Sequence, residues 1–373
     1  MIGAVSSSAI VALLGHADQP TDGVRDFVQL LGRAVEGRGR PFLVERLPGL
    51  DPSAHARLQA LTRAHGGAWF VVQYTALQWS RRAVPLGLPR LLRGIRTAGG
   101  RAAIVFHDVA PYAGTRPVDY ARRALQRHTM RRAVALTDHA FVAGQHGPGT
   151  HVPGGFAGWA PASDGLTFLP VGSILPPLAA EQCGRPQPRT RRPGGVTRVG
   201  VFGITDGRDA IEAAQIGEVL RLASARMGAV EFVAFGRGTD RASALLRQHV
   251  PAGIAVRTLG VVAPETLLAE AVELDALLFV RHHVSAQRSS AMAAVAAGVP
   301  IVGYRGAHTS LPVEGWGLRL VPEGDVEALA AALVEVTASE ALWQQLHAAN
   351  LTAYTRHIAW EHIADRFLDG LQP

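Results

Sequence analysis

The chain contains no lysine, so all 37 of its basic residues are arginines. This absence excludes the chemistry that needs a lysine side chain: a Walker-type phosphate-binding lysine, a pyridoxal Schiff base and a lysine nucleophile. Cysteine is almost absent as well, because Cys183 is the only one. A single cysteine excludes an internal disulfide and a multi-cysteine metal site.

Long apolar runs are also missing. Although 48% of the residues are hydrophobic, no run approaches the ~20 residues that a membrane-spanning helix needs. The chain does not begin with a charged segment, an apolar core and a cleavage site, so we expect a cytoplasmic protein. Its 373 residues are enough for two domains of ordinary size, each with its own core.

The net charge of +7 is unevenly distributed. Residues 1–178 hold 19 arginines against 10 acidic residues, whereas residues 199–373 hold 13 against 19. A basic first half indicates an anionic partner. Arg123, Arg127 and Arg131 recur every four residues and would form one basic helix face. This face predicts peripheral contact with the anionic inner surface of the cell membrane or with a phosphate-bearing acceptor; an ordinary solvated helix face is the alternative.

Nucleic acid is another anionic partner that a basic half could bind. The sequence shows no zinc-finger spacing, helix-turn-helix signal or aromatic RNA-binding signature. We therefore expect no nucleic-acid partner.

Short apolar runs alternate with helical or irregular segments along the whole chain. They cover Ile10–Leu14, Phe42–Val44, Ala68–Val72, Ala102–Phe106, His139–Val142, Leu166–Leu169, Thr197–Phe202, Phe232–Phe235, Ile254–Leu259, Ala276–Val280, Pro300–Tyr304 and Leu318–Val321. Strands that alternate with helices form parallel, doubly wound sheets. Pro, Arg and Gly cluster between the sixth and seventh runs, which predicts a linker at 179–196. We therefore predict an α/β chain with two Rossmann-like domains, 1–178 and 197–373, that face a cleft.

Polar residues follow the fourth strand of the second half at its carboxyl end, where open α/β sheets bind ligands. Arg281 and Arg288 lie in this loop with Ser285, and Ser289 and Ser290 begin a helix of small residues. N–H groups at a helix N-terminus bind anions, and guanidinium groups pair with phosphate. The segment 281–290 therefore predicts a site for a phosphorylated ligand, with an ordinary solvated loop as the alternative.

Two further strand ends carry candidate residues. Gly203 ends the first strand of the second half, and Arg208 follows in a short loop where its guanidinium can pair with phosphate oxygens. In the first half, His107 and Asp108 follow a strand end in the segment FHDVAPY. A histidine in this place acts as a general base, as a hydrogen-bond donor to a sugar hydroxyl, or only as a packed loop residue.

Several segments together resemble one family. They are AAVAAGVPIVGYRG at 293–306, GWGLRLVPEGDVEALAAALVEV at 315–336, HIAWEHIADRFLDGL at 357–371, DGVRDFVQLLGRAVEGRG at 22–39 and LPVGSILP at 169–176. They are similar to the GT-B glycosyltransferases, most closely the retaining family 4 or group 1 type. The segment at 22–39 resembles the family's glycine-led first helix, which would place Gly23 beside the donor phosphates.

The chain departs from the family at a pair of glutamates that usually contact the donor sugar and its ribose. Their positions hold Ser285 and Ala293, neither of which is acidic, and an alanine cannot accept a hydrogen bond from a hydroxyl. Ile204 stands where the family has an arginine for the donor diphosphate, and Arg208 substitutes for its lysine. Arg281, Arg288 and the nearby serines would have to compensate.

The resemblance implies a retaining, metal-independent transferase of polysaccharide or glycoconjugate synthesis. It would move a sugar from a nucleoside-diphosphate sugar to a glycan or lipid-linked acceptor, with no cofactor besides that donor. His107 would be the catalytic residue, in contact with the transferred sugar. The expected donor-binding residues are Gly23, Gly203, Arg208, Arg281, Ser285, Arg288, Ser289 and Ser290.

Other functions stay open from the sequence. A binding or scaffold protein of the same fold would explain the missing glutamates. A sugar-nucleotide epimerase would need carboxylates in the cleft as acid and base, and no convincing set is present. A nicotinamide dehydrogenase is disfavoured, because no G-x-G-x-x-G follows the first strand.

Overall fold

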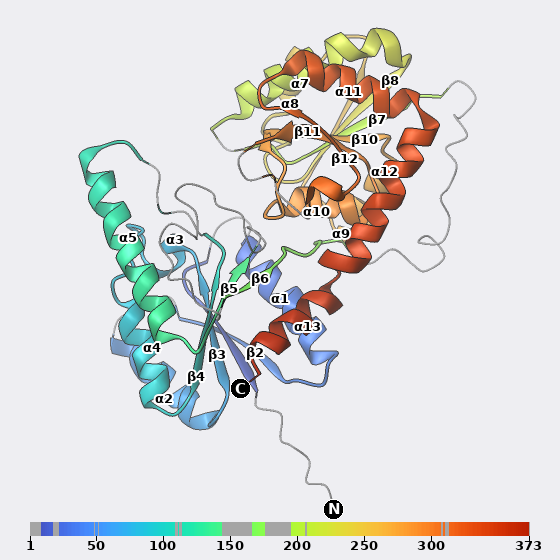
Figure 1. The fold of residues 1–373 in the computed structure, drawn as a ribbon. Coiled ribbons are helices and arrows are strands. Elements are labelled where there is room, and N and C mark those ends of the chain that lie inside the picture. Colours follow the sequence, from blue (N-terminus) through green and yellow to red (C-terminus); the bar gives the residue numbers. More distant parts are fainter. Residues whose placement is uncertain are drawn as a thin grey trace, which may run out of the picture. The chain divides into compact units, whose positions relative to one another are not determined.

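A computed structural model describes residues 9–17, 22–47, 49–50, 52–108, 111, 114–143, 166–175, 195–205, 207–306, 309 and 313–372. The chain divides into two compact units (Figure 1). The first unit contains Met1–Pro170 and Trp360–Pro373, and the second contains Val171–Ala359. The predicted linker, 179–196, lies outside the described residues except for its last two positions.

The first unit is built on a six-stranded parallel sheet. Its strands are β1 (Ile10–Leu14), β2 (Phe42–Arg46), β3 (Trp69–Tyr74), β4 (Arg101–Phe106), β5 (His139–Ala143) and β6 (Leu166–Leu169). They lie in the order β2-β1-β3-β4-β5-β6. Every residue of β1 and β3 is buried, as expected for central strands that helices cover on both faces. The order reverses direction between β1 and β3, which is the place where doubly wound sheets bind ligands.

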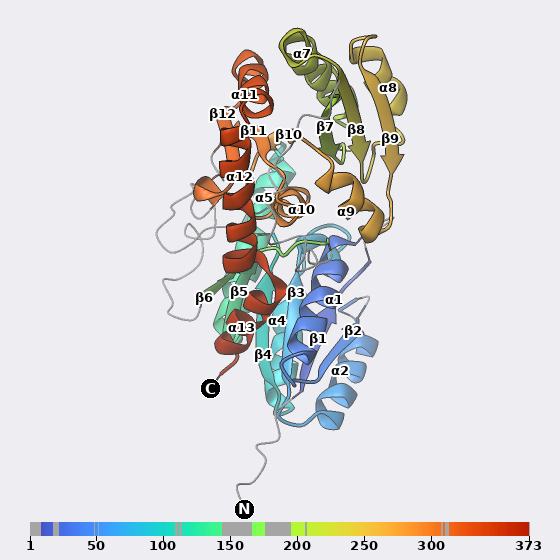
Figure 2. The same ribbon diagram turned by 90° about the vertical axis from the view of Figure 1, so that its right-hand side faces the viewer.

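Helices cover both faces of this sheet. They are α1 (Gly23–Glu36), α2 (Pro52–Ala64), α3 (Ala76–Trp79), α4 (Leu88–Thr97), α5 (Pro117–Leu136) and α13 (Trp360–Gly370). One core packs α1 and α13 on the sheet, and a second core packs α2, α4 and α5 on the opposite face. In both views α1 and α13 belong to the same unit, and they contact each other directly (Figures 1 and 2). The apolar runs expected in the first half all form strands here.

The last helix, α13, differs from the predicted domain boundaries. The prediction placed all of 197–373 in the second domain, whereas α13 packs in the first unit. Phe367 is fully buried there, with its ring 5.0 Å from that of Phe141. The Trp360 ring lies 5.4 Å from that of Phe27 in an edge-on contact. The apolar face of α13 therefore completes the core over β1 and β3.

The second unit contains another six-stranded parallel sheet. Its strands are β7 (Thr197–Phe202), β8 (Val230–Phe235), β9 (Ala255–Gly260), β10 (Ala276–His283), β11 (Ile301–Arg305) and β12 (Leu318–Pro322). They lie in the order β12-β11-β10-β7-β8-β9. The order reverses between β7 and β10. Two doubly wound parallel sheets confirm the predicted fold class.

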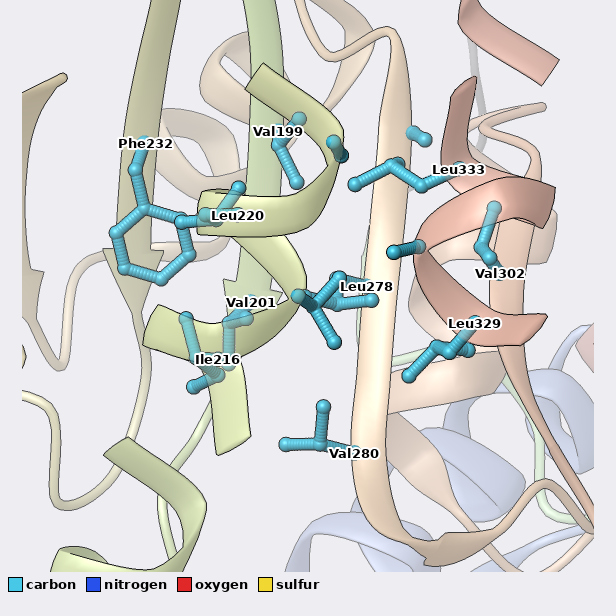
Figure 3. Packing of buried hydrophobic residues seen from close by; sticks show 14 of the residues in the cluster. Val199, Val201, Ile216, Leu220, Phe232, Leu278, Val280, Val302, Leu329 and Leu333 are labelled. Atoms are coloured by element: carbon cyan, nitrogen blue, oxygen red, sulfur yellow. The ribbon is translucent and has the colours of Figure 1, made fainter. Parts of the chain in front are cut away.

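Helices again cover the sheet on both faces. They are α7 (Asp209–Met227), α8 (Ser243–His249), α9 (Pro264–Val272), α10 (Ser289–Ala296), α11 (Val326–Ala338) and α12 (Glu340–Ala353), with short helical turns at Val313–Gly315 and Tyr354–Ile358. Figure 3 shows Ile216 and Leu220 of α7 and Leu329 and Leu333 of α11 packed with strand residues such as Leu278. On the opposite face, α9 and α10 pack beside Leu277.

Strand β10 is longer than predicted. The prediction ended it at Val280 and placed Arg281–Arg288 in a loop, whereas the strand runs to His283. Its pairing with β11 shifts register between Phe279 and His283, and His282 has a φ of +54°. A bulge of this kind redirects side chains at the end of a strand. Arg281 is consequently held by the sheet and not by a loop.

Candidate functional site

The predicted donor-binding residues of the second unit gather where its strand order reverses. Gly203 and Arg208 follow β7, and Arg281 lies near the end of β10, which is the neighbour of β7. Ser285, Arg288, Ser289 and Ser290 lie between β10 and the first residues of α10. Because parallel strands end at the same edge of a sheet, the two segments meet at the ligand-binding position of a doubly wound fold.

Gly203 lets an arginine approach the main chain. Its φ is +78°, and an added Cβ would lie 2.9 Å from Nη1 of Arg281. The N–H of Gly203 donates to the carbonyl of Phe235 on β8, at 2.7 Å. Glycine therefore meets two demands here, a left-handed backbone and space for the guanidinium.

The Arg281 guanidinium is anchored on the turn after β7. Its Nε donates to Oγ1 of Thr205 at 3.1 Å, and its Nη1 donates to the carbonyl of Phe202 at 3.4 Å. Burial lowers the pKa of Arg281, the carboxylate of Glu212 opposes that shift, and the positive charges of Arg288 and Arg237 add to it. Several cationic side chains therefore share one partly buried region.

Glu212, in the first turn of α7, is the buried carboxylate of this region. It is 1% exposed. Its Oε2 accepts a hydrogen bond from the N–H of Thr205 at 3.0 Å, and its Oε1 has no hydrogen-bond partner among the described residues. Its charge raises the pKa of both Arg281 and Arg288 against the effect of burial. Glu212 is thus an internal counter-ion that partly neutralises the arginines.

Arg288 immediately precedes α10 and is half-buried. Burial lowers its pKa. Its guanidinium makes no hydrogen bond or ion pair with any residue that the structure describes. Beside it, Ser285 and Ser290 are buried and Ser289 is exposed. The side chain therefore keeps five N–H donors available for a ligand.

Arg208 lies at the start of α7 on the same turn as Thr205. Its backbone N–H donates to the carbonyl of Thr205 at 3.1 Å, and its side chain is exposed. The structure therefore brings Gly203, Arg208 and Arg281 to one turn. Sequence reasoning missed Thr205 and Glu212, because nothing in the local pattern distinguishes a counter-ion from an ordinary acidic residue in the first turn of a helix.

In the first unit, His107 follows β4 beside the carboxyl end of β3. Its Nε2 lies 2.8 Å from Oε1 of Gln73, and its ring meets that of Phe27 edge-on at 5.0 Å. Burial lowers the pKa of His107 to about 4, although the Asp22 carboxylate acts in the opposite direction. The sequence reasoning missed Gln73. Its position, a polar residue directly after the apolar run Ala68–Val72, could have indicated a buried polar side chain that needs a partner, because β3 is buried throughout.

Gly23, the remaining predicted donor-binding residue, begins α1 in the first unit. Asp22 caps this helix by accepting a hydrogen bond from the N–H of Arg25 at 3.1 Å. It also forms an ion pair with Arg46 at 3.1 Å. The N-terminus of α1 therefore already faces a carboxylate. That Gly23 helps to bind the nucleotide sugar stays a prediction.

No group of three or more His, Cys, Asp or Glu side chains is placed to hold a metal ion within the described part of the chain. The charged side chains around the second-unit site are mostly arginines. The chemistry that this site offers is therefore binding of an anion by guanidinium and N–H donors.

Solved structures match the chain over nearly its whole length. The Anabaena protein HepE, in complex with UDP and glucose, is 12% identical with a TM-score of 0.62, over 97% of this chain and 99% of HepE. Sucrose-phosphate synthase from Thermosynechococcus elongatus is 14% identical with a TM-score of 0.64, over 97% and 98% of the two chains. WaaG, a glycosyltransferase involved in lipopolysaccharide biosynthesis, is 13% identical with a TM-score of 0.59, over 96% and 99%.

The chain has the GT-B fold. No protein-family model matches the sequence, and no curated protein matches it. The structural matches establish this fold. Because the sequences are only 12 to 14% identical, the matches do not establish an activity, which has to be argued from the site. In this GT-B chain, the predicted donor-binding residues other than Gly23 gather at the reversal of strand order in the second unit, while His107 follows β4 in the first.

Proposed function

We propose that the protein is a glycosyltransferase that moves a sugar from a nucleoside-diphosphate sugar to an acceptor. The observation that carries the proposal is the arginine site at the β7–β10 reversal of a GT-B chain. Arg281 is bound to the turn after β7, and Gly203 leaves room for it. An anchored, desolvated guanidinium is suited to hold a diphosphate.

The leaving group explains why arginines belong in such a site. When the bond between the sugar C1 and the diphosphate oxygen breaks, negative charge develops on the diphosphate. Fixed cations and N–H donors stabilise that charge without reorganising during the reaction. Arg281, Arg208 and Arg288 supply these cations in the proposal, and Gly203 lets the first of them lie against the backbone. The reaction then needs no metal ion.

The first unit takes the acceptor in this proposal. The acceptor is a glycan or a lipid-linked glycan, whose hydroxyl forms the new bond to C1 and passes its proton to the leaving diphosphate. Retention of the configuration at C1 is part of the proposal and is supported by the resemblance of residues 293–306 and 315–336 to retaining transferases. His107 contacts the transferred sugar, where a neutral imidazole whose Nε2–H is bound to Gln73 can accept a hydrogen bond at Nδ1.

Nucleotide binding by the second unit is the first test. We expect calorimetry to show binding of at least one of UDP, GDP and ADP, and Arg281→Ala to weaken it by about 1.5–3 kcal/mol, the range for hydrogen bonds to a charged group. Arg208→Ala should weaken it in the same direction. Arg226→Ala is the matched control, because Arg226 is an exposed arginine in the last turn of α7, at the opposite end of that helix. If Arg281→Ala binds like the parent, the diphosphate is not held here.

A binding or scaffold protein is the second candidate function. The observation that favours it concerns the two positions where the resembled family has glutamates. They hold Ser285 and Ala293, which are buried and not acidic. Such a protein would bind a nucleotide weakly or not at all, and it would have no turnover. Sugar transfer or slow hydrolysis of a bound nucleotide sugar supports the transferase. Neither reaction, across acceptors with and without a lipid, together with weak or absent nucleotide binding supports the scaffold.

A further inference from the structure

Strand β3 carries one amide side chain, Gln73, among apolar and aromatic ones. Gln73 is fully buried, with 0% of its surface exposed. Its side-chain Nε2 has no hydrogen-bond partner among the residues that the structure describes. A buried amide with an unpaired donor is less favourable than an apolar side chain of the same size. Packing of the core therefore does not explain why β3 has a glutamine at this position.

The oxygen of the same amide contacts His107. Oε1 of Gln73 lies 2.8 Å from Nε2 of the imidazole. The indole N–H of Trp79 donates to the main-chain carbonyl of Gln73 at 2.7 Å, and the ring of Phe27 meets the imidazole edge-on at 5.0 Å. Both partners are thus held in place. Because an amide oxygen only accepts hydrogen bonds, the contact puts the imidazole proton on Nε2 and leaves a lone pair on Nδ1.

The neutral amide also affects the charge of His107. A carboxylate beside a histidine favours the imidazolium form, whereas an amide does not. Burial lowers the pKa of His107 to about 4, and the Asp22 carboxylate, which also caps α1, acts in the opposite direction. Asp108 follows His107 in the chain and is exposed, and burial raises the pKa of Tyr74, which therefore stays uncharged. Gln73 is the side chain that contacts the imidazole nitrogen without adding a charge.

We propose that Gln73 is the positioning residue of His107: its amide oxygen keeps the imidazole proton on Nε2, so that Nδ1 accepts a hydrogen bond from a hydroxyl of the transferred sugar. The inference rests on the proposed function, because His107 meets the sugar only there. In the other tautomer Nδ1 would carry a proton. It would then donate a hydrogen bond and could not accept one from the hydroxyl.

Nitrogen-15 NMR of the imidazole reports the tautomer without any need for turnover. We expect His107, assigned by the loss of its signals in His107→Ala, to show a protonated Nε2 and an unprotonated Nδ1 from pH 8 to pH 6. Gln73→Met, which keeps the length of the side chain and removes the amide, should abolish the preference for Nε2. Gln73→Glu puts a carboxylate beside the ring, so the pKa of His107 should rise and both nitrogens should be protonated at pH 6. Gln126→Met removes another buried amide of the first unit and should leave these signals unchanged.

Turnover should follow the tautomer. Gln73→Met should lower kcat roughly ten- to a hundredfold with little change in nucleotide affinity, as the loss of a partner that orients a histidine does in metal sites. In Gln73→Glu, kcat/KM should fall as the pH drops through the raised pKa of His107 and recover at higher pH. A residue that acts only through another has no effect once that other is removed. Adding Gln73→Met to His107→Ala should therefore cost no further turnover.

Three results would overturn the proposal. A proton on Nδ1 of His107 in the parent would mean that the amide is turned the other way, with its N–H donating to the ring. The same loss of kcat from Gln73→Met with and without His107 would make Gln73 a structural residue of β3. If the parent neither transfers a sugar nor hydrolyses a donor, the proposed function fails and the role in turnover fails with it. The NMR measurement distinguishes that failure, because it decides separately whether Gln73 sets the tautomer.

Discussion

His107 carries no charge at neutral pH, and this limits what it can do chemically. Burial places its pKa near 4, so the imidazolium form is rare in the physiological range. Because Oε1 of Gln73 accepts the bond at Nε2, that nitrogen carries the proton and Nδ1 keeps its lone pair. The side chain can therefore accept a hydrogen bond from a sugar hydroxyl, but it has no spare proton to act as an acid.

If His107 has a catalytic role, its replacement should lower turnover and leave the affinity for the nucleotide unchanged. We expect His107→Ala to lower kcat by a factor of roughly 10² to 10⁴, or less if the ring only orients a hydroxyl. Nucleotide affinity should hardly change, because the proposed arginine contacts to the diphosphate belong to the second unit. His128→Ala, which removes an exposed histidine on α5, should leave both quantities unchanged.

The pH dependence adds a readout for the same residue. Since the pKa of His107 is lowered, its neutral form is present at and above pH 6.5 and is lost only as the pH falls toward about 4. The contribution of His107 to kcat/KM should therefore be level from pH 8 to pH 6. Full activity in His107→Ala, or a His107-dependent fall in activity centred near pH 6.5, would contradict this role.

At the scale of elements, α13 is the helix whose domain the prediction placed wrongly. The apolar positions of 360–370 are periodic, and the segment forms an amphipathic helix in the structure. They do not indicate which sheet receives its apolar face. That choice depends on Phe42 and Phe141, which lie more than 200 residues away in sequence and surround Phe367.

The placement of α13 predicts which unit a mutation there destabilises. Phe367→Ala removes a fully buried ring and should lower the free energy of unfolding of the first unit by about 3–5 kcal/mol, the usual cost of deleting a large core aromatic. Hydrogen exchange under mild denaturant should then speed up in β1 and β3 and not in β7 and β10. Leu333→Ala, in the core of the second unit, is the control and should give the reverse pattern. Faster exchange in β7 for Phe367→Ala would show that α13 supports the second unit.

Most of the fold can be read from the sequence, and the site only in part. Buried parallel strands are continuous apolar runs, so the predicted strands are all found, with ends that differ by a few residues. Gly203 and Arg281 lie together because β7 and β10 are neighbours in the sheet. The resemblance to a known family can predict that strand order. The contact of Gln73 with His107 and the bond from Thr205 N–H to Glu212 depend on side-chain geometry between elements, for which the sequence has no local signal.

For the whole molecule, the excess of positive charge in the first unit can be compared with the exposed apolar side chains of the same unit. In the first unit, Leu77, Leu86, Val118 and Tyr120 are each more than half exposed. Gln126 on α5 donates to the carbonyl of Ala83 at 2.6 Å, which fixes α5 to the segment that contains the first two. We call Leu77, Leu86 and Tyr120, with Arg123, Arg127 and Arg131 of α5, the basic apolar surface.

No helix within the described residues is long and apolar enough to cross a membrane. Attachment at the surface of a bilayer needs less: an apolar contact and positive charge facing anionic headgroups. The basic apolar surface has both, and the Arg123 guanidinium lies 4.2 Å from the centre of the Tyr120 ring, which pairs charge with an amphipathic side chain. We therefore expect the first unit to bind anionic membranes, where a lipid-linked acceptor would be found.

Vesicle sedimentation tests this expectation. The parent should bind vesicles that contain phosphatidylserine and not those of phosphatidylcholine alone, and added salt should weaken the binding. Replacing Arg123, Arg127 and Arg131 by Gln should cost about 1 kcal/mol for each charge, so roughly a hundredfold in affinity for the triple variant. Replacing Arg226, Arg247 and Arg356, three exposed arginines of the second unit, should cost little, because these residues lie outside the basic apolar surface. Equal binding to both kinds of vesicle, or the same loss in the two triple variants, would mean that the arginines of α5 do not form a membrane contact and only carry the net charge.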